Sequence, residues 1–193
     1  MSIATDKLLE PIYMNGVLLL TESGERIAAK YYRDKQLAET KAQFEFEARV
    51  HAKLNEMDVR PSSVESIIFE KYIMVFKVYG DGTRLIVFAP LEENELLVFS
   101  VLSAIDETLR WFVEDVNAKK LGSRLRFIML IIDEVLDDGL VVDNEVNSIV
   151  QRLVATPEDS STTVSTLNTG VRDHTLTGAL FSVGEQLMKS LRS

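Results

Sequence analysis

The sequence has no cysteine among its 193 residues, which excludes disulfides, thiolate nucleophiles and cysteine-ligated metal sites. Its two histidines, His51 and His174, are too few for a histidine metal cage and lack the nucleophile context of a catalytic triad. Positive charge is also scarce, because 21 Lys and Arg stand against 30 Asp and Glu and give a net charge of −9. Proteins that bind nucleic acid neutralise phosphates with clustered cations, so we expect no nucleic-acid partner.

Long hydrophobic runs are missing as well. The longest, such as Phe127-Ile-Met-Leu-Ile-Ile132, fall far short of the roughly 20 residues needed to span a bilayer. The first ten residues lack the basic and apolar regions of a signal peptide. Together with the absence of cysteine, these features lead us to expect a soluble, cytoplasmic protein.

The residues that are present fit a globular domain, since 46% of them are apolar. Runs rich in Val, Ile, Leu and Phe predict five strands, at 17–20, 26–32, 64–70, 72–79 and 83–89. Gly24 marks a turn after the first strand, and Gly80-Asp-Gly82 marks a turn before the last. Consecutive strands joined by short turns form an antiparallel sheet.

Helical patterns predict helices at 37–57, 94–116 and 144–155, with a loop at 119–123. The run at 124–136 is apolar almost all round, so periodicity does not distinguish a strand from a helix there, and its length favours a helix. Asn94 is placed to cap the second helix. The side of that helix that is expected to face solvent carries Ser103, Asp106, Glu107, Arg110 and Glu114. The sequence therefore predicts an α+β domain over 1–155, in which helices flank a five-stranded antiparallel sheet.

A Ser/Thr-rich linker is predicted at 156–172, because its polar residues cannot form a core. An amphipathic helix is predicted at 173–193, with one apolar stripe made of Leu176, Leu180, Val183, Leu187 and Leu191. A helix of this length is marginal alone in water, so we expect the stripe to pack on a protein surface.

The first predicted helix has two apolar faces and is therefore expected to be covered on both sides. One face carries Leu37, Phe44 and Ala48, and the other carries Phe46, Val50 and Met57, with Leu54 nearby. We expect one face to pack on the sheet and the other to meet the tail helix or another protein. The expected partner-binding residues are Phe46, Val50, Leu54, Leu180, Val183 and Leu187.

Few residues are candidates for catalysis, metal binding or ligand binding. In the acidic run Asp133-Glu-Val-Leu-Asp-Asp-Gly139, positions 133/137 and 134/138 would share helical faces. We interpret this run as a structural helix end, with a carboxylate-dependent enzyme using Asp133 and Asp137 as the alternative. His51 is expected to be a packed, hydrogen-bonded residue. The cations Lys119, Lys120, Arg124 and Arg126 predict a basic loop, either merely solvated or in contact with lipid headgroups or an acidic partner.

Four segments resemble the coatomer zeta subunit family. They are Gly16-Val-Leu-Leu-Leu-Thr-Glu-Ser-Gly-Glu-Arg-Ile-Ala-Ala-Lys-Tyr-Tyr32, Asn94-Glu-Leu with the helix predicted after it, Ile132-Asp-Glu-Val-Leu-Asp-Asp-Gly-Leu-Val142 and Gly184-Glu-Gln-Leu-Met-Lys-Ser-Leu-Arg192. Leu140 stands where the family has its second glycine after the acidic pair. The resemblance implies a longin-like fold, which clathrin-adaptor sigma subunits share.

The resemblance also implies a function. Zeta subunits pair with the trunk of gamma-coatomer inside heptameric coatomer, the COPI coat of Golgi-to-ER and intra-Golgi vesicles. An Arf-family GTPase recruits that coat through larger subunits, so the resemblance implies membrane contact only through the coat, with no catalysis and no cofactor. The alternative is a sigma-type subunit that binds acidic dileucine cargo signals, although the tail after Thr156 favours zeta. A longin-domain SNARE is disfavoured, because only about 20 helical residues are predicted after the linker, too few for its heptads.

Overall fold

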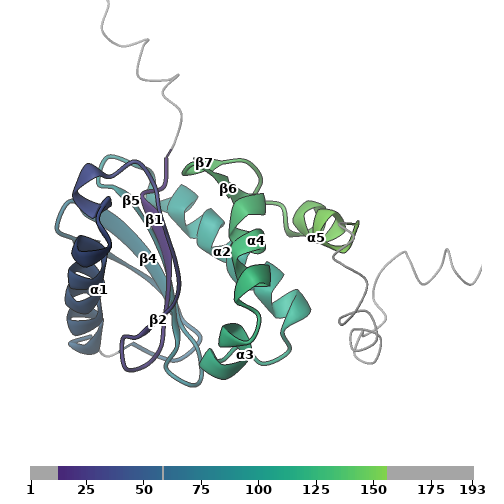
Figure 1. Cartoon of the computed structure of the whole chain (residues 1–193), viewed down its shortest axis with the longest axis horizontal. Coiled ribbons are helices and arrows are strands. Elements are labelled where there is room, and N and C mark those ends of the chain that lie inside the picture. The colour runs from purple at the N-terminus through teal and green to yellow at the C-terminus, as the bar shows by residue number, and fades with distance from the viewer. Residues whose placement is uncertain (1–12, 58, 156–193) are drawn as a thin grey trace, which may run out of the picture. The chain divides into compact units, whose positions relative to one another are not determined.

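The computed structural model describes residues 13–57 and 59–155 of the chain. Its centre is a five-stranded antiparallel sheet with the strand order β2-β1-β5-β4-β3 (Figure 1). The strands are β1 (Gly16–Leu20), β2 (Arg26–Tyr31), β3 (Val64–Phe69), β4 (Tyr72–Val78) and β5 (Arg84–Pro90). The predicted sheet is thus confirmed. The linker at 156–172 and the helix at 173–193 lie outside the described residues and stay predictions, as do the domain boundaries.

Strand β1 lies inside the sheet, between β2 and β5. All five of its residues are buried, which explains why its sequence is continuously apolar and does not alternate. A Cβ atom at Gly16 would stand 2.6 Å from the carbonyl oxygen of Lys30 and 2.6 Å from the Phe88 ring. Glycine is therefore needed where β1 begins between its neighbours β2 and β5.

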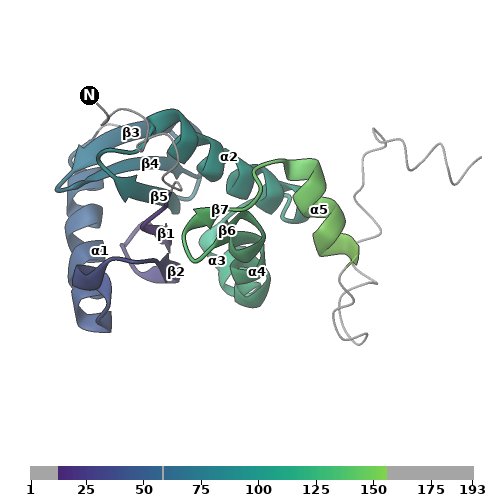
Figure 2. The ribbon, with the colours of Figure 1, turned by 90° about the horizontal axis from the view of Figure 1, so that it is seen from above.

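Helices cover both faces of the sheet. They are α1 (Thr40–Asn55), α2 (Glu95–Phe112), α3 (Ala118–Gly122), α4 (Leu125–Val135) and α5 (Val146–Ala155), with a 3-10 turn at Lys35–Leu37 before α1. Helix α1 lies on one face, and α2 and α4 lie on the other (Figure 2). Because strand side chains alternate between faces, the two faces have separate cores.

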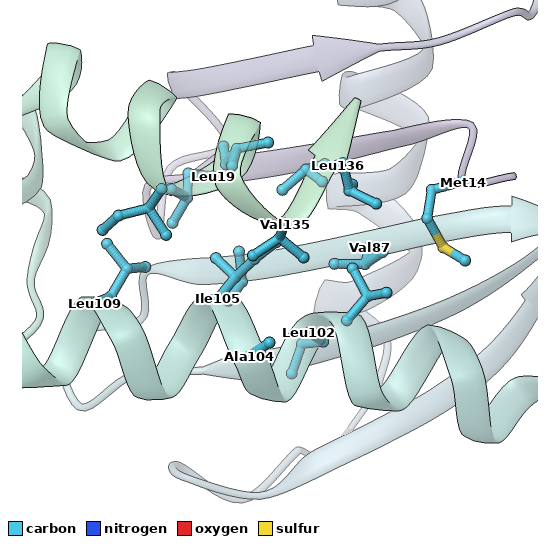
Figure 3. Close-up of a cluster of buried hydrophobic side chains, with 14 of the residues drawn as sticks. Met14, Leu19, Val87, Leu102, Ala104, Ile105, Leu109, Val135 and Leu136 are labelled. Atoms are coloured by element: carbon cyan, nitrogen blue, oxygen red, sulfur yellow. The ribbon is translucent and has the colours of Figure 1, made fainter. Parts of the chain in front are cut away.

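The larger core lies between the sheet and the α2 and α4 layer. Figure 3 shows Leu19 and Val87 of the sheet gathered with Leu102 and Ile105 of α2 and with Val135 at the end of α4. All five side chains are fully buried. The apolar side of α2 therefore faces this core, as the 3.6-residue period of its apolar residues requires.

The smaller core lies under α1 and is largely aromatic. The Phe46 ring centroid is 5.4 Å from that of Tyr72 and 5.3 Å from that of Phe88, in tilted and edge-on arrangements. Such geometries are favoured by the ring quadrupoles and add to the gain from burying apolar area. The contacts fix which side of α1 faces the sheet.

Two segments after α2 differ from the predictions. Helix α2 ends at Phe112 and not at Val116, because Val113 turns to extended backbone, where its side chain is buried. The expected loop at 119–123 is instead the short helix α3. The side chain of Asn117 accepts a hydrogen bond from the Lys120 backbone N–H at 3.0 Å, and this cap allows a helical turn to form.

The Asp138-Gly139 pair forms the turn of a second, small hairpin between β6 (Leu136–Asp137) and β7 (Leu140–Val141). Both residues have positive φ, at 46° for Asp138 and 82° for Gly139, which is the backbone of a tight two-residue hairpin turn. The sequence predicts a helix end here but not the hairpin, because each strand has two residues and shows no alternation.

Candidate functional site

The acidic run at the end of α4 is structural in the described residues. The helix ends at Val135, so positions 133/137 and 134/138 do not share helical faces, which corrects the sequence analysis. The carboxylates instead form separate ion pairs: Asp133 with Lys30, Glu134 with Arg152 at 2.6 Å, and Asp138 with Arg33 at 2.7 Å. These pairs connect the α4–β6 segment to β2 and its following turn, and to α5.

Metal binding has no support in this region. Across residues 13–57 and 59–155, no group of three or more His, Asp or Glu side chains is arranged to hold a metal ion. A carboxylate with its own cationic partner is already neutralised, whereas a divalent cation needs several oxygen ligands directed at one point. The interpretation of the acidic run as a structural element agrees with this geometry.

Asp133→Ala is expected to lower the free energy of unfolding by less than about 1 kcal/mol, because its ion pair is solvent-exposed. Denaturant unfolding of the full chain measures the change. The same variant and the wild type should show equal melting temperatures with and without Mg²⁺, Ca²⁺ or Mn²⁺, since a specific ligand stabilises the folded state by mass action. Metal-dependent stabilisation that disappears in Asp133→Ala would restore the carboxylate-enzyme alternative.

His51 is a packed and hydrogen-bonded residue, as expected. Arg84 donates from Nη1 to His51 Nδ1 at 2.7 Å, and Asn55 lies 2.9 Å from His51 Nε2. Burial and the neighbouring Arg84 guanidinium lower the pKa of His51 below its ordinary value. The ring therefore stays neutral at physiological pH and helps to hold the β1–β2 turn, where Gly24 packs against it.

The partner-binding residues predicted on the first helix are core residues. Phe46, Val50 and Leu54 are at most 3% exposed and face the sheet, so they offer no surface to a partner. This corrects the assignment of the two faces of α1: the outward apolar residue is Phe44, which is 53% exposed. The other predicted residues, Leu180, Val183 and Leu187, lie outside the described residues, and their role stays a prediction.

A buried ion pair, which the sequence does not predict, links the sheet to α2. Lys77 Nζ on β4 lies 2.7 Å from Asp106 Oδ2, and both residues are almost fully buried. Tyr79 OH donates to Asp106 Oδ1 at 2.8 Å, and Arg110 Nε lies 3.0 Å from the same atom. Asp106 was expected on the side of the helix that faces solvent, but Lys77 and Tyr79 cover it. Burial and the Asp106 carboxylate raise the pKa of Tyr79 well above its ordinary value.

An apolar surface remains open at one edge of the sheet. Strand β3 is an edge strand, and within the described residues no strand pairs with its outer side. Val64 lines a shallow hollow together with Leu96 and Phe99 of α2, and Ser66 Oγ donates to Glu95 above it. Leu96 is 75% exposed, and Ile68, further along the same face of the strand, is 68% exposed. We call Val64, Ile68, Leu96 and Phe99 the β3–α2 surface.

Exposed apolar groups of this kind mark interaction sites more often than catalytic ones, because a catalytic site needs convergent polar groups in a cleft. The β3–α2 surface combines large apolar side chains with an unpaired strand edge, a feature that natural proteins usually cover. Among the described helices, none is both long and apolar enough to cross a membrane. These features are more typical of an interaction surface than of a catalytic site.

Comparison with known proteins agrees with the fold and with this character. Residues 13–160 match the clathrin adaptor complex small chain family. Among solved structures, a chain of a homology model of the full-length AP-3 complex in a stretched open conformation superposes with a TM-score of 0.55, covering 73% of this chain and 91% of that one. Since the identity is 18%, this likeness shows the fold alone.

The relatives found by sequence identify the group within this family. The coatomer subunit zeta of Saccharomyces cerevisiae is 31% identical over 154 residues, covering 75% of this chain and 78% of the relative. The coatomer subunit zeta-3 of Arabidopsis thaliana is 30% identical over 183 residues, 94% of each chain. The coatomer subunit zeta-1 of Homo sapiens is 27% identical over 167 residues, 83% of this chain and 89% of the relative. The chain therefore belongs to the clathrin adaptor complex small chain family and, within it, to the coatomer zeta subunits.

Proposed function

We propose that this protein is the small subunit of a COPI coat and pairs with the trunk of a gamma-coatomer subunit. The observation that carries the proposal is its similarity, over most of its length, to coatomer zeta subunits of yeast, plants and mammals. The family match over residues 13–160 and the longin-like sheet are consistent with it. In this role the domain is a structural and interaction module, and it performs no catalysis.

The proposal extends to location and transport step. The protein acts within heptameric coatomer, on Golgi membranes and on vesicles for Golgi-to-ER and intra-Golgi transport, and an Arf-family GTPase recruits the coat through the larger subunits. What supports this extension is the zeta resemblance alone. A sigma-type subunit of a clathrin adaptor is the competing function, since both groups belong to the matched family.

Purification of the full chain as bait from a eukaryotic lysate tests the proposal. The expected result is recovery of the gamma subunit together with the other coatomer subunits in fixed proportion. Recovery of an adaptor large subunit in their place would assign the chain to the sigma group. Recovery of neither would refute the proposal.

The β3–α2 surface is the described surface best suited to the gamma subunit. Protein interfaces that bury apolar area usually exceed about 1,200 Å² in total and are centred on large apolar or aromatic side chains. Phe99 and Leu96 provide such a centre beside an open strand edge. Their exposure means that they add little to the stability of the isolated domain, so polar replacements there should leave it folded.

Leu96→Ser combined with Phe99→Ser is expected to weaken binding of the gamma-coatomer trunk by at least about 30-fold, the effect of losing an apolar centre of an interface. Isothermal titration or co-purification of the co-expressed pair measures it. The matched control is Phe44→Ser, which removes a similarly exposed ring from α1 on the other face of the sheet. Weakening by Phe44→Ser alone would place the gamma subunit on α1.

A further inference from the structure

The end of the domain formed by α3, the last turn of α2 and the start of α4 differs in character from the rest of the surface. Figure 1 shows α3 and the beginning of α4 at the same end. Arg124 donates from Nη1 to the Phe112 carbonyl oxygen at 2.8 Å, which ties α4 to the end of α2. We call six exposed residues there the basic end: Trp111, Lys119, Lys120, Arg124, Leu125 and Arg126.

The charge of this end is opposite to that of the protein. The chain has a net charge of −9, yet residues 110–126 hold five Lys and Arg against Glu114 and Asp115. Lys120 lies 3.2 Å from Asp115. Within the part of the chain that the structure describes, Lys119, Arg124 and Arg126 form no ion pair. Their charges are therefore available to an external anion.

The position of the two arginines is unfavourable for the fold itself. Arg124 is the N-cap of α4 and Arg126 lies in its first turn, where the helix dipole is positive and favours acidic residues. The first turn has no acidic residue. The hydrogen bond from Arg124 to the Phe112 carbonyl gives that residue a role in the fold. Arg126 forms no hydrogen bond or ion pair within the described residues, so its charge opposes the dipole of the helix that carries it without a contact that offsets this cost.

Large apolar side chains lie among these charges. Trp111 is 49% exposed, and its ring centroid lies 5.1 Å from that of Phe112 in a tilted arrangement. The Phe112 ring in turn meets that of Phe127 on α4 edge-on, with the centroids 4.7 Å apart. Leu125, between the two arginines, is 44% exposed. The rings of Phe112 and Phe127 thus connect the exposed indole at the end of α2 to α4, the helix that carries Leu125.

We propose that the basic end binds an anionic membrane surface directly. Tryptophan prefers the headgroup level of a bilayer, and exposed leucine adjoining it buries apolar area at the boundary of the acyl chains. Clustered Lys and Arg are attracted by anionic lipids, an attraction worth about fivefold in binding per cation near the surface. An acidic peptide would engage the cations but would leave the indole and Leu125 without an apolar environment, so the combination favours a lipid surface.

This contact goes beyond the proposed function, which places the membrane contact in other subunits. Alone, a few cations and two apolar side chains give weak binding. In a coat many copies face one membrane, and linked weak contacts then add to a strong one. The basic end would orient each small subunit toward the bilayer that the coat surrounds.

Vesicle binding of the full chain tests the proposal, because Trp111 is its single tryptophan and reports its own environment. The probes are vesicles of phosphatidylcholine with phosphatidylserine and vesicles of phosphatidylcholine alone. We expect binding to the first only, weakened by salt, with a blue shift of the tryptophan emission and quenching by brominated lipid. The triple variant Lys119→Glu, Arg124→Glu, Arg126→Glu should bind at least about a hundredfold more weakly.

The control is the triple variant Lys35→Glu, Lys41→Glu, Lys53→Glu, which changes three exposed cations of the α1 region. It has the same net charge as the first variant. It should lose only the part of the vesicle affinity that depends on the net charge of the protein. Equal loss in both variants would show attraction by net charge alone and would overturn the proposal. Binding without an emission shift would exclude the basic end as the contact. Loss of gamma-subunit binding in the first variant, with no vesicle binding by the wild type, would assign the surface to a protein partner. The vesicle measurements do not depend on whether the chain recovers coatomer, so failure of this proposal and failure of the proposed function can be told apart.

Discussion

Asp106→Ala is expected to lower the free energy of unfolding by about 3–5 kcal/mol, the cost of leaving one buried charge without its partner. Lys77 has little access to water in the structure, and its ammonium lies 2.7 Å from the Asp106 carboxylate. Without that carboxylate, the buried lysine must lose its proton or draw water into the core. Tyr79 loses its hydrogen-bond acceptor in the same step. Denaturant unfolding monitored by circular dichroism, analysed with a common slope, measures the loss.

Two controls separate the buried charge from other effects. Glu107→Ala removes the neighbouring exposed carboxylate of α2 and should change stability by less than about 0.5 kcal/mol. The variant Lys77→Met, Tyr79→Phe, Asp106→Leu replaces the whole polar group by apolar side chains and should recover most of the lost stability. A loss below about 1 kcal/mol in Asp106→Ala would show that water reaches Lys77, contrary to its burial.

The features that depend on neighbours in the sequence are the ones the sequence predicts well. The β1–β2 hairpin follows from an apolar run, a glycine turn and an alternating run, and Asn94 caps α2 by accepting from the Leu96 N–H at 2.9 Å. Each signal involves only a few neighbouring residues, so the sequence is enough to predict the local structure. These local signals predict the five strands of the sheet and the helices α1, α2 and α5, which the structure confirms, but not α3 or the β6–β7 hairpin.

The features that depend on distant residues are the ones it misses. Asp106 sits on the polar side of its helix by periodicity, and Lys77, 29 residues earlier on a strand, makes that position internal. Similarly, the sequence does not distinguish the two apolar faces of α1, and contacts with the rings of Tyr72 and Phe88 place Phe46 on the sheet side. The candidate surfaces follow the same rule, since Leu96 and Phe99 are exposed because the edge strand beside them has no further neighbour.

The turn at Gly139 is a second position where stability depends on one residue. Its φ of 82° lies in the left-handed region, which costs a residue with a Cβ about 1–2 kcal/mol. The turn also has no room: an added Cβ would stand 2.5 Å from the Met14 carbonyl oxygen and 2.9 Å from the Tyr32 side chain. Met14 is held there because its N–H donates to the Gly139 carbonyl at 2.7 Å, so the chain entering β1 cannot move away without losing a backbone hydrogen bond.

Gly139→Ala is therefore expected to lower the free energy of unfolding by about 2–4 kcal/mol, the sum of backbone strain and overpacking. Gly122→Ala is the matched control, because nothing lies within 4 Å of its added Cβ and it ends α3 without a left-handed φ. That control should stay within about 1 kcal/mol of the wild type, in either direction. Parallel denaturant unfolding of the two variants compares them, and amide exchange at Met14 locates the damage. Equal stability of the two would mean that the β6–β7 hairpin opens freely, and the ion pair between Arg33 and Asp138 would then have no part in holding it.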